Sequence, residues 1–207
     1  FFVTKIPESG GMVTVETCSE QIVYEIHDPE NYLTPDVVAD FKQVKFTEVE
    51  KDKVKVEGAS GKPRTETFKC FIGYKDCFIG EGEISYGGSN CMARAELAAE
   101  ILEKRIALTG IELEEYRTDF IGCNSLYRDA ISKKIGSGTP CEVRLRAAGR
   151  TKDRKNAVLL ANEVEALYTN GPAGGGGAVK RVSEIVSVCS IFVPRDAVEA
   201  KVTFREV

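Results

Sequence analysis

Two stretches of helical periodicity, each lying between runs of strand-forming residues, constrain the fold of this 207-residue chain more than any other feature. Apolar residues of the first stretch recur at helical spacing at Ala95, Ala98, Leu102 and Ile106. The second stretch has a similar apolar face at Ala157, Leu160, Ala161, Val164, Leu167 and Tyr168. Gly110 and Gly171 follow the two stretches, at positions where helices commonly end. The pattern predicts two amphipathic helices that each bury one face against a sheet.

Runs of aromatic and β-branched residues, which favour strands, flank both helices. The predicted strands are Phe68–Tyr74, Cys77–Tyr86, Tyr116–Gly122, Glu142–Ala148, Ile185–Val193 and Ala197–Arg205. A strand pair, a long helix and a further strand therefore occur twice, around residues 68–122 and 142–204. We expect an α/β (α+β) fold with a mixed β-sheet, helices packed mainly on one face, and two related β-α-β units.

The domain organisation follows from the length of the elements. Short elements occupy residues 1–64, and we expect them to lead into an α/β core formed by residues 65–207, the whole being one compact domain. The chain opens with Phe1, Phe2 and Val3 rather than with Met, and this start already has the pattern of a strand. We therefore expect the sequence to be part of a longer protein.

Local turn and cap patterns predict the elements of residues 1–64. In chain order they are a hairpin of Phe2–Ile6 and Met12–Val15, a short helix ending before Pro29, a helical turn at Thr34–Asp36, strands Val44–Val49 and Val54–Glu57, and a loop Gly58–Arg64. The hairpin rests on the turn pattern Gly10–Gly11. The helix rests on Thr17 and Glu20, which have the spacing of a capping box.

The charge balance separates this chain from most nucleic-acid-binding proteins. It carries 28 basic and 32 acidic residues, and its pI is about 5.3, whereas a nucleic-acid-binding domain commonly has a pI above about 9. The most basic segment, Arg144 to Arg154, is expected to form the polar face of a strand and a solvated helix start, with anion binding as the alternative. No apolar run reaches the roughly 18 residues needed to cross a bilayer, and no signal-peptide pattern is present. We expect a protein that binds neither nucleic acid nor membranes.

Cysteine and histidine offer few candidate sites. None of the seven cysteines forms a C-x-x-C pair, which favours reduced thiols in the cytoplasm. Cys91 lies in the first turn of a predicted helix, where thiol pKa values fall, but no second ionisable partner is evident, so a nucleophilic role is the minor alternative. His27 is the only histidine, and its place at a predicted helix end favours a structural role. The sequence has no cluster with the spacing of a zinc site.

The segment Gly80–Glu83 carries the candidate catalytic residues. In a strand, Glu81 and Glu83 project to the same face, and the flanking glycines let another backbone or a ligand approach. Two carboxylates on one side can bind a divalent cation, or one can transfer a proton. The alternative is a solvent-facing strand edge with a bulge at Gly82.

The glycine-rich segment Thr169–Gly177 is the candidate anion- or substrate-binding site. Its candidate residues are Asn170, Gly171, Gly174, Gly175, Gly176 and Gly177. Consecutive glycines can direct several backbone N–H groups at a phosphate or carboxylate. The run follows a helix, however, whereas a phosphate loop precedes one. The alternative is a helix stop followed by a flexible loop.

Four segments, taken together and in order, resemble one known family: Tyr24–Pro29, Tyr32–Val37, Gly80–Tyr86 and Ala166–Gly177. The chain resembles the acyclic terpene utilisation family (AtuA type) over nearly its whole length. The resemblance implies that it corresponds to the C-terminal half of such a protein, with the N-terminal half as a partner. It also implies a role in the catabolism of acyclic terpenes and related branched acids, handled as acyl-CoA thioesters. It assigns no catalytic residues.

Two functions are compatible with these patterns, and they leave open whether the chain is an enzyme. In the first, the chain contributes to a site for a small carboxylate or acyl-CoA, with a divalent cation or a coenzyme A thioester as the candidate cofactor. In the second, it is a non-catalytic structural or oligomerisation module of a larger protein. The second predicts a homo-oligomer.

Overall fold

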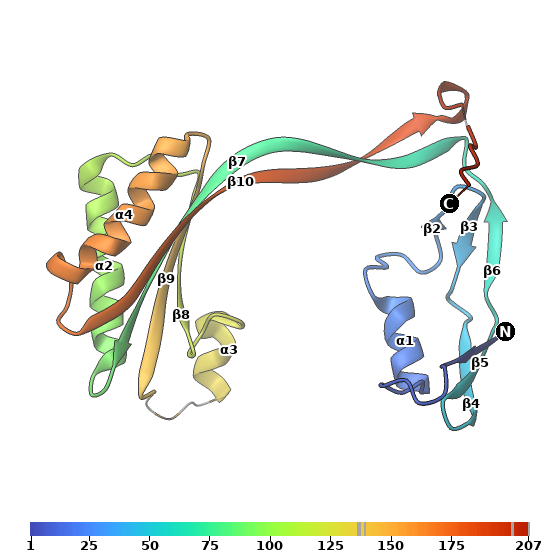
Figure 1. The fold of residues 1–207 in the computed structure, drawn as a ribbon, viewed down its shortest axis with the longest axis horizontal. Helices are drawn as coiled ribbons and strands as arrows, with labels where there is room; N and C mark the ends of the chain where they lie inside the picture. Colours follow the sequence, from blue (N-terminus) through green and yellow to red (C-terminus); the bar gives the residue numbers. More distant parts are fainter. Residues whose placement is uncertain (136–137, 139, 200, 207) are drawn as a thin grey trace. The chain divides into compact units, whose positions relative to one another are not determined.

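The chain folds into two compact units. The computed structural model describes residues 1–135, 138, 140–199 and 201–206. Unit 1 comprises Phe1–Ile72 and Cys189–Val207, and unit 2 comprises Gly73–Val188. The boundary predicted at residue 64 was based on local sequence patterns. The two units are instead defined by contacts, which place Cys189–Val207 in unit 1. The described residues form helices and antiparallel sheets, which confirms the predicted α/β (α+β) class (Figure 1).

Unit 2 is built on one four-stranded sheet. In chain order its elements are β7 (Thr67–Gly87), α2 (Cys91–Thr109), β8 (Glu115–Ile121), α3 (Arg128–Ile135), β9 (Glu142–Thr151), α4 (Arg154–Asn170) and β10 (Gly175–Pro194), of which β7 and β10 also contribute residues to unit 1. The strand order is β10-β7-β9-β8. With α3 set aside as an insertion, this β-α-β-β-α-β connection is that of ferredoxin-like folds.

Helices α2 and α4 cover one face of this sheet (Figure 1). The strands alternate, so that Ile84 and Tyr86 of β7 and Leu145 of β9 point into the core beneath the helices. Leu102 of α2 and Val164 of α4 are fully buried above them. The opposite sheet face carries the charged residues of the same strands. The two β-α-β units and the predicted helix faces are therefore confirmed, except at Tyr168, which was expected on the inner face of α4 and is half exposed.

Two glycines of β7 let α4 approach the sheet closely. A Cβ atom at Gly80 would lie 2.2 Å from the carbonyl oxygen of Ala157, and one at Gly82 would lie 2.5 Å from Cβ of Val164. Neither distance is compatible with a real side chain, so both positions need glycine. The close approach expected of these glycines is thus made by a helix of the same unit.

Unit 1 contains short strands and one helix. The strands are β1 (Phe2–Thr4), β2 (Tyr32–Leu33), β3 (Val37–Asp40), β4 (Lys45–Glu50), β5 (Lys53–Glu57) and β6 (Ser60–Pro63), and the helix is α1 (Val15–Val23). They form two three-stranded sheets, ordered β1-β5-β4 and β2-β3-β6. A small core gathers Cys18 of α1 with Val54 and Val56 of β5.

The predicted N-terminal hairpin is wrong. Strand β1 pairs with β5, with Phe2 opposite Lys55, and the segment after the turn is not a strand but leads into α1, which begins at Val15. The helix cap lies three residues earlier than predicted: the Thr14 hydroxyl accepts a hydrogen bond from the N–H of Thr17 at 3.3 Å, and the Thr17 hydroxyl accepts one from the N–H of Thr14 at 2.9 Å. A capping box is therefore present, but Thr14 rather than Thr17 occupies its first position, and Thr17 takes the place expected for Glu20.

Three further elements differ from the expectations. Thr34–Asp36 connects β2 to β3 as a turn, because the Thr34 hydroxyl bonds the backbone of Val37. The predicted loop Gly58–Arg64 contains β6, which pairs with β3. The predicted strand Ala197–Arg205 is absent from the described residues there: a short 3₁₀ helix, η1 (Arg195–Ala197), comes first, and no strand follows it within the described part.

Candidate functional site

The two predicted catalytic carboxylates form ion pairs with arginines of the neighbouring strand. Glu81 and Glu83 lie on the sheet face opposite the helices, and their side chains are about one-fifth exposed, at 20% and 21%. Glu81 accepts hydrogen bonds from Nε of Arg146 at 2.8 Å and from a terminal nitrogen of the same guanidinium. Glu83 accepts from Nε of Arg144. Glu81 and Glu83 lie on one face of the sheet, as predicted. On that face each carboxylate is already paired with an arginine.

The ion pairs continue across the sheet to Asp119, which the sequence analysis did not single out. Asp119 of β8 is almost fully buried, and it accepts hydrogen bonds from Arg146 at 3.1 Å and from Arg117 at 2.6 Å. Arg117 also donates to the carbonyl of Ser125 at 3.2 Å. The charges therefore alternate in the order Glu81, Arg146, Asp119, Arg117. Charge-assisted bonds of this kind fix side chains firmly in place.

This geometry limits what the two glutamates can do in the structure as it stands. A carboxylate must leave its guanidinium before it can accept a proton from a substrate or coordinate a metal ion. The contacts themselves hold Arg144 and Arg146 in place on the sheet. A catalytic role for Glu81 and Glu83 stays a prediction.

The glycine-rich segment has its carbonyl groups, rather than its N–H groups, bound by side chains. Arg94 of α2 donates to the carbonyl of Ala173 at 2.8 Å, and Arg144 donates to that of Gly177 at 3.2 Å. Gly174 and Gly177 have positive φ angles of 78° and 60°, which favour glycine. Anion binding by the candidate residues of this segment stays a prediction.

Arg144 brings the two predicted segments together. Its guanidinium binds Glu83 of β7, the Ser85 hydroxyl at 2.9 Å, and the carbonyl of Gly177 of β10. The other candidates lie apart from this contact: Asn170 is the last residue of α4, and Gly171 follows it. Gly175 starts β10, where a Cβ atom would lie 2.8 Å from Ile84, and Gly176 has no atom within 4 Å of that position.

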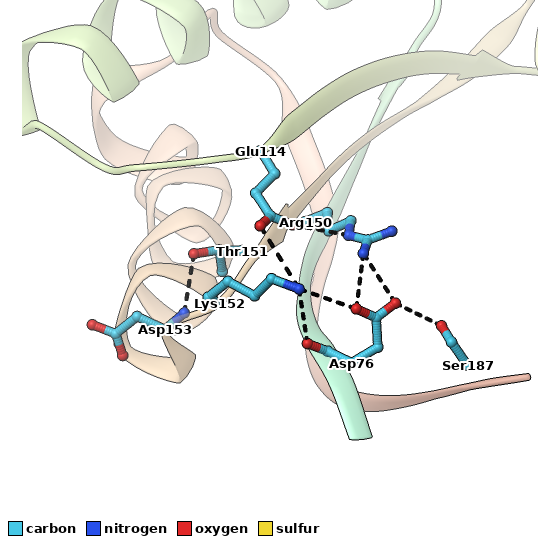
Figure 2. Close-up of polar contacts among 7 residues, drawn as sticks. All are labelled: Asp76, Glu114, Arg150, Thr151, Lys152, Asp153 and Ser187. Atoms are coloured by element: carbon cyan, nitrogen blue, oxygen red, sulfur yellow. Dashed lines mark hydrogen bonds and ion pairs between the residues drawn. The ribbon is translucent and has the colours of Figure 1, made fainter. Parts of the chain in front are cut away.

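A second polar cluster joins three strands of the sheet around Asp76 (Figure 2). Arg150 of β9 binds both carboxylate oxygens of Asp76, at 3.0 and 2.9 Å, and Lys152 binds one of them at 3.0 Å. The Ser187 hydroxyl of β10 donates to the other oxygen at 2.6 Å. Glu114 completes the cluster by accepting from Arg150 at 3.0 Å.

The surroundings of Asp76 keep it ionised. The Ser187 hydroxyl above all, then the Lys152 ammonium and the Arg150 guanidinium, lower the pKa of Asp76. A carboxylate with a lowered pKa is a weak base, so it is poorly suited to activate Ser187 as a nucleophile. The cluster therefore acts as a polar cross-link between β7, β9 and β10.

A pocket of about 460 Å³ lies within unit 1, at the segment that follows α1. Its wall includes the aromatic residues Tyr24, Tyr32 and Phe71 and the polar residues His27, Asp28, Asn31 and Lys69. Helix α1 ends at Val23, so the placement of His27 at a helix end is wrong. Tyr24–Pro29 and Tyr32–Val37 are two of the segments that resemble the family, but no local pattern indicates that they line one pocket with residues of β7.

The charged groups of this pocket differ in how they are held. Asp28 closes its own turn by accepting from the side chain of Asn31 at 2.9 Å and from the N–H of Glu30 at 3.0 Å. These bonds, that from Asn31 above all, lower the pKa of Asp28. Lys69 Nζ lies 5.3 Å from the centre of the Phe71 ring. No carboxylate of the described residues lies within 4.0 Å of this ammonium. An unpaired cation beside an aromatic ring can bind an anion that carries an apolar body.

The described residues offer neither a cluster of metal ligands nor an exposed cysteine thiol at the predicted position, Cys91. Within them, no group of three or more His, Cys, Asp or Glu side chains is placed to hold a metal ion. Cys91 is buried, with its thiol 3.1 Å from the carbonyl of Pro140, and burial raises the pKa of Cys123. No described helix combines the length and the apolar character that spanning a membrane requires.

Comparison with known proteins identifies the family. The model of the family described as "Acyclic terpene utilisation family protein AtuA" matches residues 1–204. No curated protein and no solved structure shows a significant match. The match covers both units described above, and the resemblance seen in the four sequence segments is thereby confirmed. The chain belongs to the acyclic terpene utilisation (AtuA) family.

Proposed function

We propose that this chain binds a small organic carboxylate in the pocket of unit 1, as part of cytoplasmic catabolism of branched acids. The observation that carries the proposal is the Lys69 ammonium, which faces an aromatic-walled pocket of about 460 Å³ and has no carboxylate partner in the described chain. Pockets for small ligands commonly have volumes of roughly 300–1,000 Å³ and combine apolar walls with a few polar groups.

The charges around the pocket favour a ligand with no more than one negative charge. Lys69 supplies a cation, and the His27 ring supplies a further hydrogen-bonding group. Glu25 and Asp28 also line the pocket, and Asp28 is engaged in its own turn. Two acidic groups near the binding site would repel the second charge of a dicarboxylate. Tyr24, Tyr32 and Phe71 would cover the hydrocarbon part of the ligand.

Calorimetric titration of the 207-residue chain tests this proposal. We expect binding of a branched monocarboxylate such as 3-methylbutanoate, and weaker binding of a dicarboxylate of similar size. Lys69→Met keeps the length of the side chain and removes its charge. It should raise the dissociation constant about ten- to hundredfold, since a hydrogen bond to a charged group contributes roughly 1.5–3 kcal/mol.

Lys104→Met is the matched control, because Lys104 is an exposed lysine of α2, in the other unit. It should bind the monocarboxylate as the wild type does. Equal affinity of the Lys69→Met and wild-type chains would contradict the proposal, as would equal loss in both variants. Titration with the matching acyl-CoA thioester decides whether the free acid or the thioester is the preferred form, because only the free acid offers its carboxylate to Lys69.

A further inference from the structure

Strand β10 forms an open edge of the sheet in unit 2. It is the first strand in the order β10-β7-β9-β8, and no described strand lies beyond it. A long edge strand presents unpaired backbone N–H and C=O groups, and natural proteins cover or interrupt such edges. From Gly175 to Val188 this edge contains no proline. The edge is therefore able to pair with another strand.

The two faces of this edge can be assigned from contacts. Lys180 bonds Asn162 and Glu165 of α4, so its side chain lies on the helix side of the sheet. Strand residues alternate, so Val182, Glu184 and Val186 share that side. Val186 is 62% exposed there, which leaves a large apolar side chain without a cover.

The edge strand is complementary to itself. Lys180 and Glu184 lie at equal distances from Val182 along the strand, and they have opposite charges. In an antiparallel pair related by a two-fold axis through Val182, each Lys180 would lie opposite Glu184 of the second copy. The charge pair would therefore form twice, which is a favourable cross-strand arrangement.

We propose that a second copy of this chain pairs with β10 in this register, which would join the two sheets into one. The helices of both copies would then lie on the same side. Val186 of one copy would lie opposite Ala178 of the other, and on the second face Val179 would lie opposite Ile185. Each of these pairs is apolar.

The surroundings of Ala178 show what would cover Val186. The N–H of Ala178 donates to the Tyr168 hydroxyl of α4 at 2.7 Å, and the Tyr168 side chain is half exposed. Val186 of the second copy would thus pack beside the C-terminal turn of α4. A hollow of about 240 Å³ bordered by Val158, Ala161 and Val182 lies next to the same edge. Association would remove these apolar surfaces from water.

The existing partners of the two charges do not oppose this pairing. Lys180 forms an ion pair with Glu165, and Glu184 forms one with Lys75. All four side chains are well exposed, and exposed ion pairs contribute little to stability. Each charge is therefore free to add a contact with the second copy.

Light scattering coupled to size-exclusion chromatography, with sedimentation velocity over a range of concentrations, tests this inference. We expect the wild-type chain to be a dimer. Glu184→Lys replaces two attractive pairs with two repulsive ones and should raise the dimer dissociation constant about tenfold. The double variant Lys180→Glu with Glu184→Lys reverses both members of each pair and should restore the dimer. Circular dichroism and thermal unfolding of each variant show whether it folds.

Two results would overturn the inference. One is a wild-type chain that stays monomeric at every concentration. The other is a dimer whose dissociation constant does not respond to folded Glu184→Lys, or is not restored in the folded double variant. In the second case another surface carries the association. Restoration by the double variant cannot come from the intramolecular pairs, because Lys180→Glu places like charges at positions 180 and 165.

Discussion

Gly80→Ala is expected to lower the unfolding temperature of this chain by roughly 5–10 °C, through overpacking that costs about 2–3 kcal/mol. The added methyl group would lie 2.2 Å from the carbonyl oxygen and 2.7 Å from the Cα of Ala157. Both atoms belong to the backbone of α4, so no side-chain rotation relieves the clash. The helix must move away from β7, and the apolar contacts between them weaken. Thermal unfolding followed by circular dichroism or calorimetry measures the shift.

Gly176→Ala provides the matched control for this variant. Gly176 is also a strand glycine of unit 2, but no atom lies within 4 Å of the place where its Cβ would be. We expect a change of less than about 0.5 kcal/mol. A comparable fall in both variants, or no fall in either, would show that the close approach of α4 does not require Gly80.

The result also bears on the two interpretations of the acidic strand. Glycines beside Glu81 and Glu83 are compatible with either a ligand or a backbone that comes close to the strand. The structure places Gly80 and Gly82 beneath α4, on the sheet face opposite the two glutamates. Helix packing therefore explains the two glycines. A functional role for Glu81 and Glu83 has to rest on contacts at the opposite face of the sheet.

The elements that sequence reasoning predicted well are those fixed by local periodicity. Helices α2 and α4 repeat apolar residues every three or four positions, and Gly110, with a φ angle of 67°, ends α2 as expected. The alternation along β9 placed Arg144 and Arg146 correctly on one face. Such patterns depend on neighbours within one or two turns, which the sequence displays directly.

The elements that it predicted poorly depend on partners far along the chain. Phe2 pairs with Lys55, so the local turn pattern at Gly10–Gly11 did not determine the pairing partner of β1. The common face of Glu81 and Glu83 followed from strand geometry, but their partners lie 65 and 61 residues away. Finding those partners requires the register between β7 and β9, which no single-strand pattern contains.

The pocket of unit 1 shows the same limit. Tyr24 and Tyr32 lie close in sequence, whereas Lys69 and Phe71 reach the pocket from β7. Tyr24 and Tyr32 belong to segments that resemble the family, but no local sequence pattern connects them to Lys69 and Phe71. The Asp76 cluster was not predicted for a similar reason, since its members come from three strands and from the segments before β8 and after β9.

Asp76→Asn is expected to lower the stability of unit 2 strongly at neutral pH and only weakly at acidic pH. The substitution removes the charge that Arg150 and Lys152 share, which leaves Lys152 with Glu114 at 3.8 Å as its remaining ion-pair partner. The pKa of Asp76 is lowered in the folded state, whereas an unfolded chain has an Asp pKa of about 3.9. Its ionisation therefore stabilises the folded state above pH about 4, and this contribution disappears as pH falls through the folded pKa. Urea unfolding of wild type and variant from pH 7 down to pH 2 measures the difference.

Ser187→Ala measures how much the hydrogen bond to Asp76 stabilises unit 2, separately from the negative charge of Asp76. The Ser187 hydroxyl is the largest cause of the lowered pKa of Asp76, so its removal should raise that pKa while Arg150 and Lys152 keep their partner. We expect a smaller loss of stability at pH 7 than in Asp76→Asn. The acid-induced loss begins near the pKa of the unfolded state in both chains, and in Ser187→Ala it should be smaller and should end at a higher pH than in the wild type. If the difference between wild type and Asp76→Asn were the same at every pH, the ionised carboxylate would not be the stabilising group. The loss would then come from packing around residue 76, and the cluster would be a consequence of the fold rather than a cross-link that holds β7, β9 and β10 together.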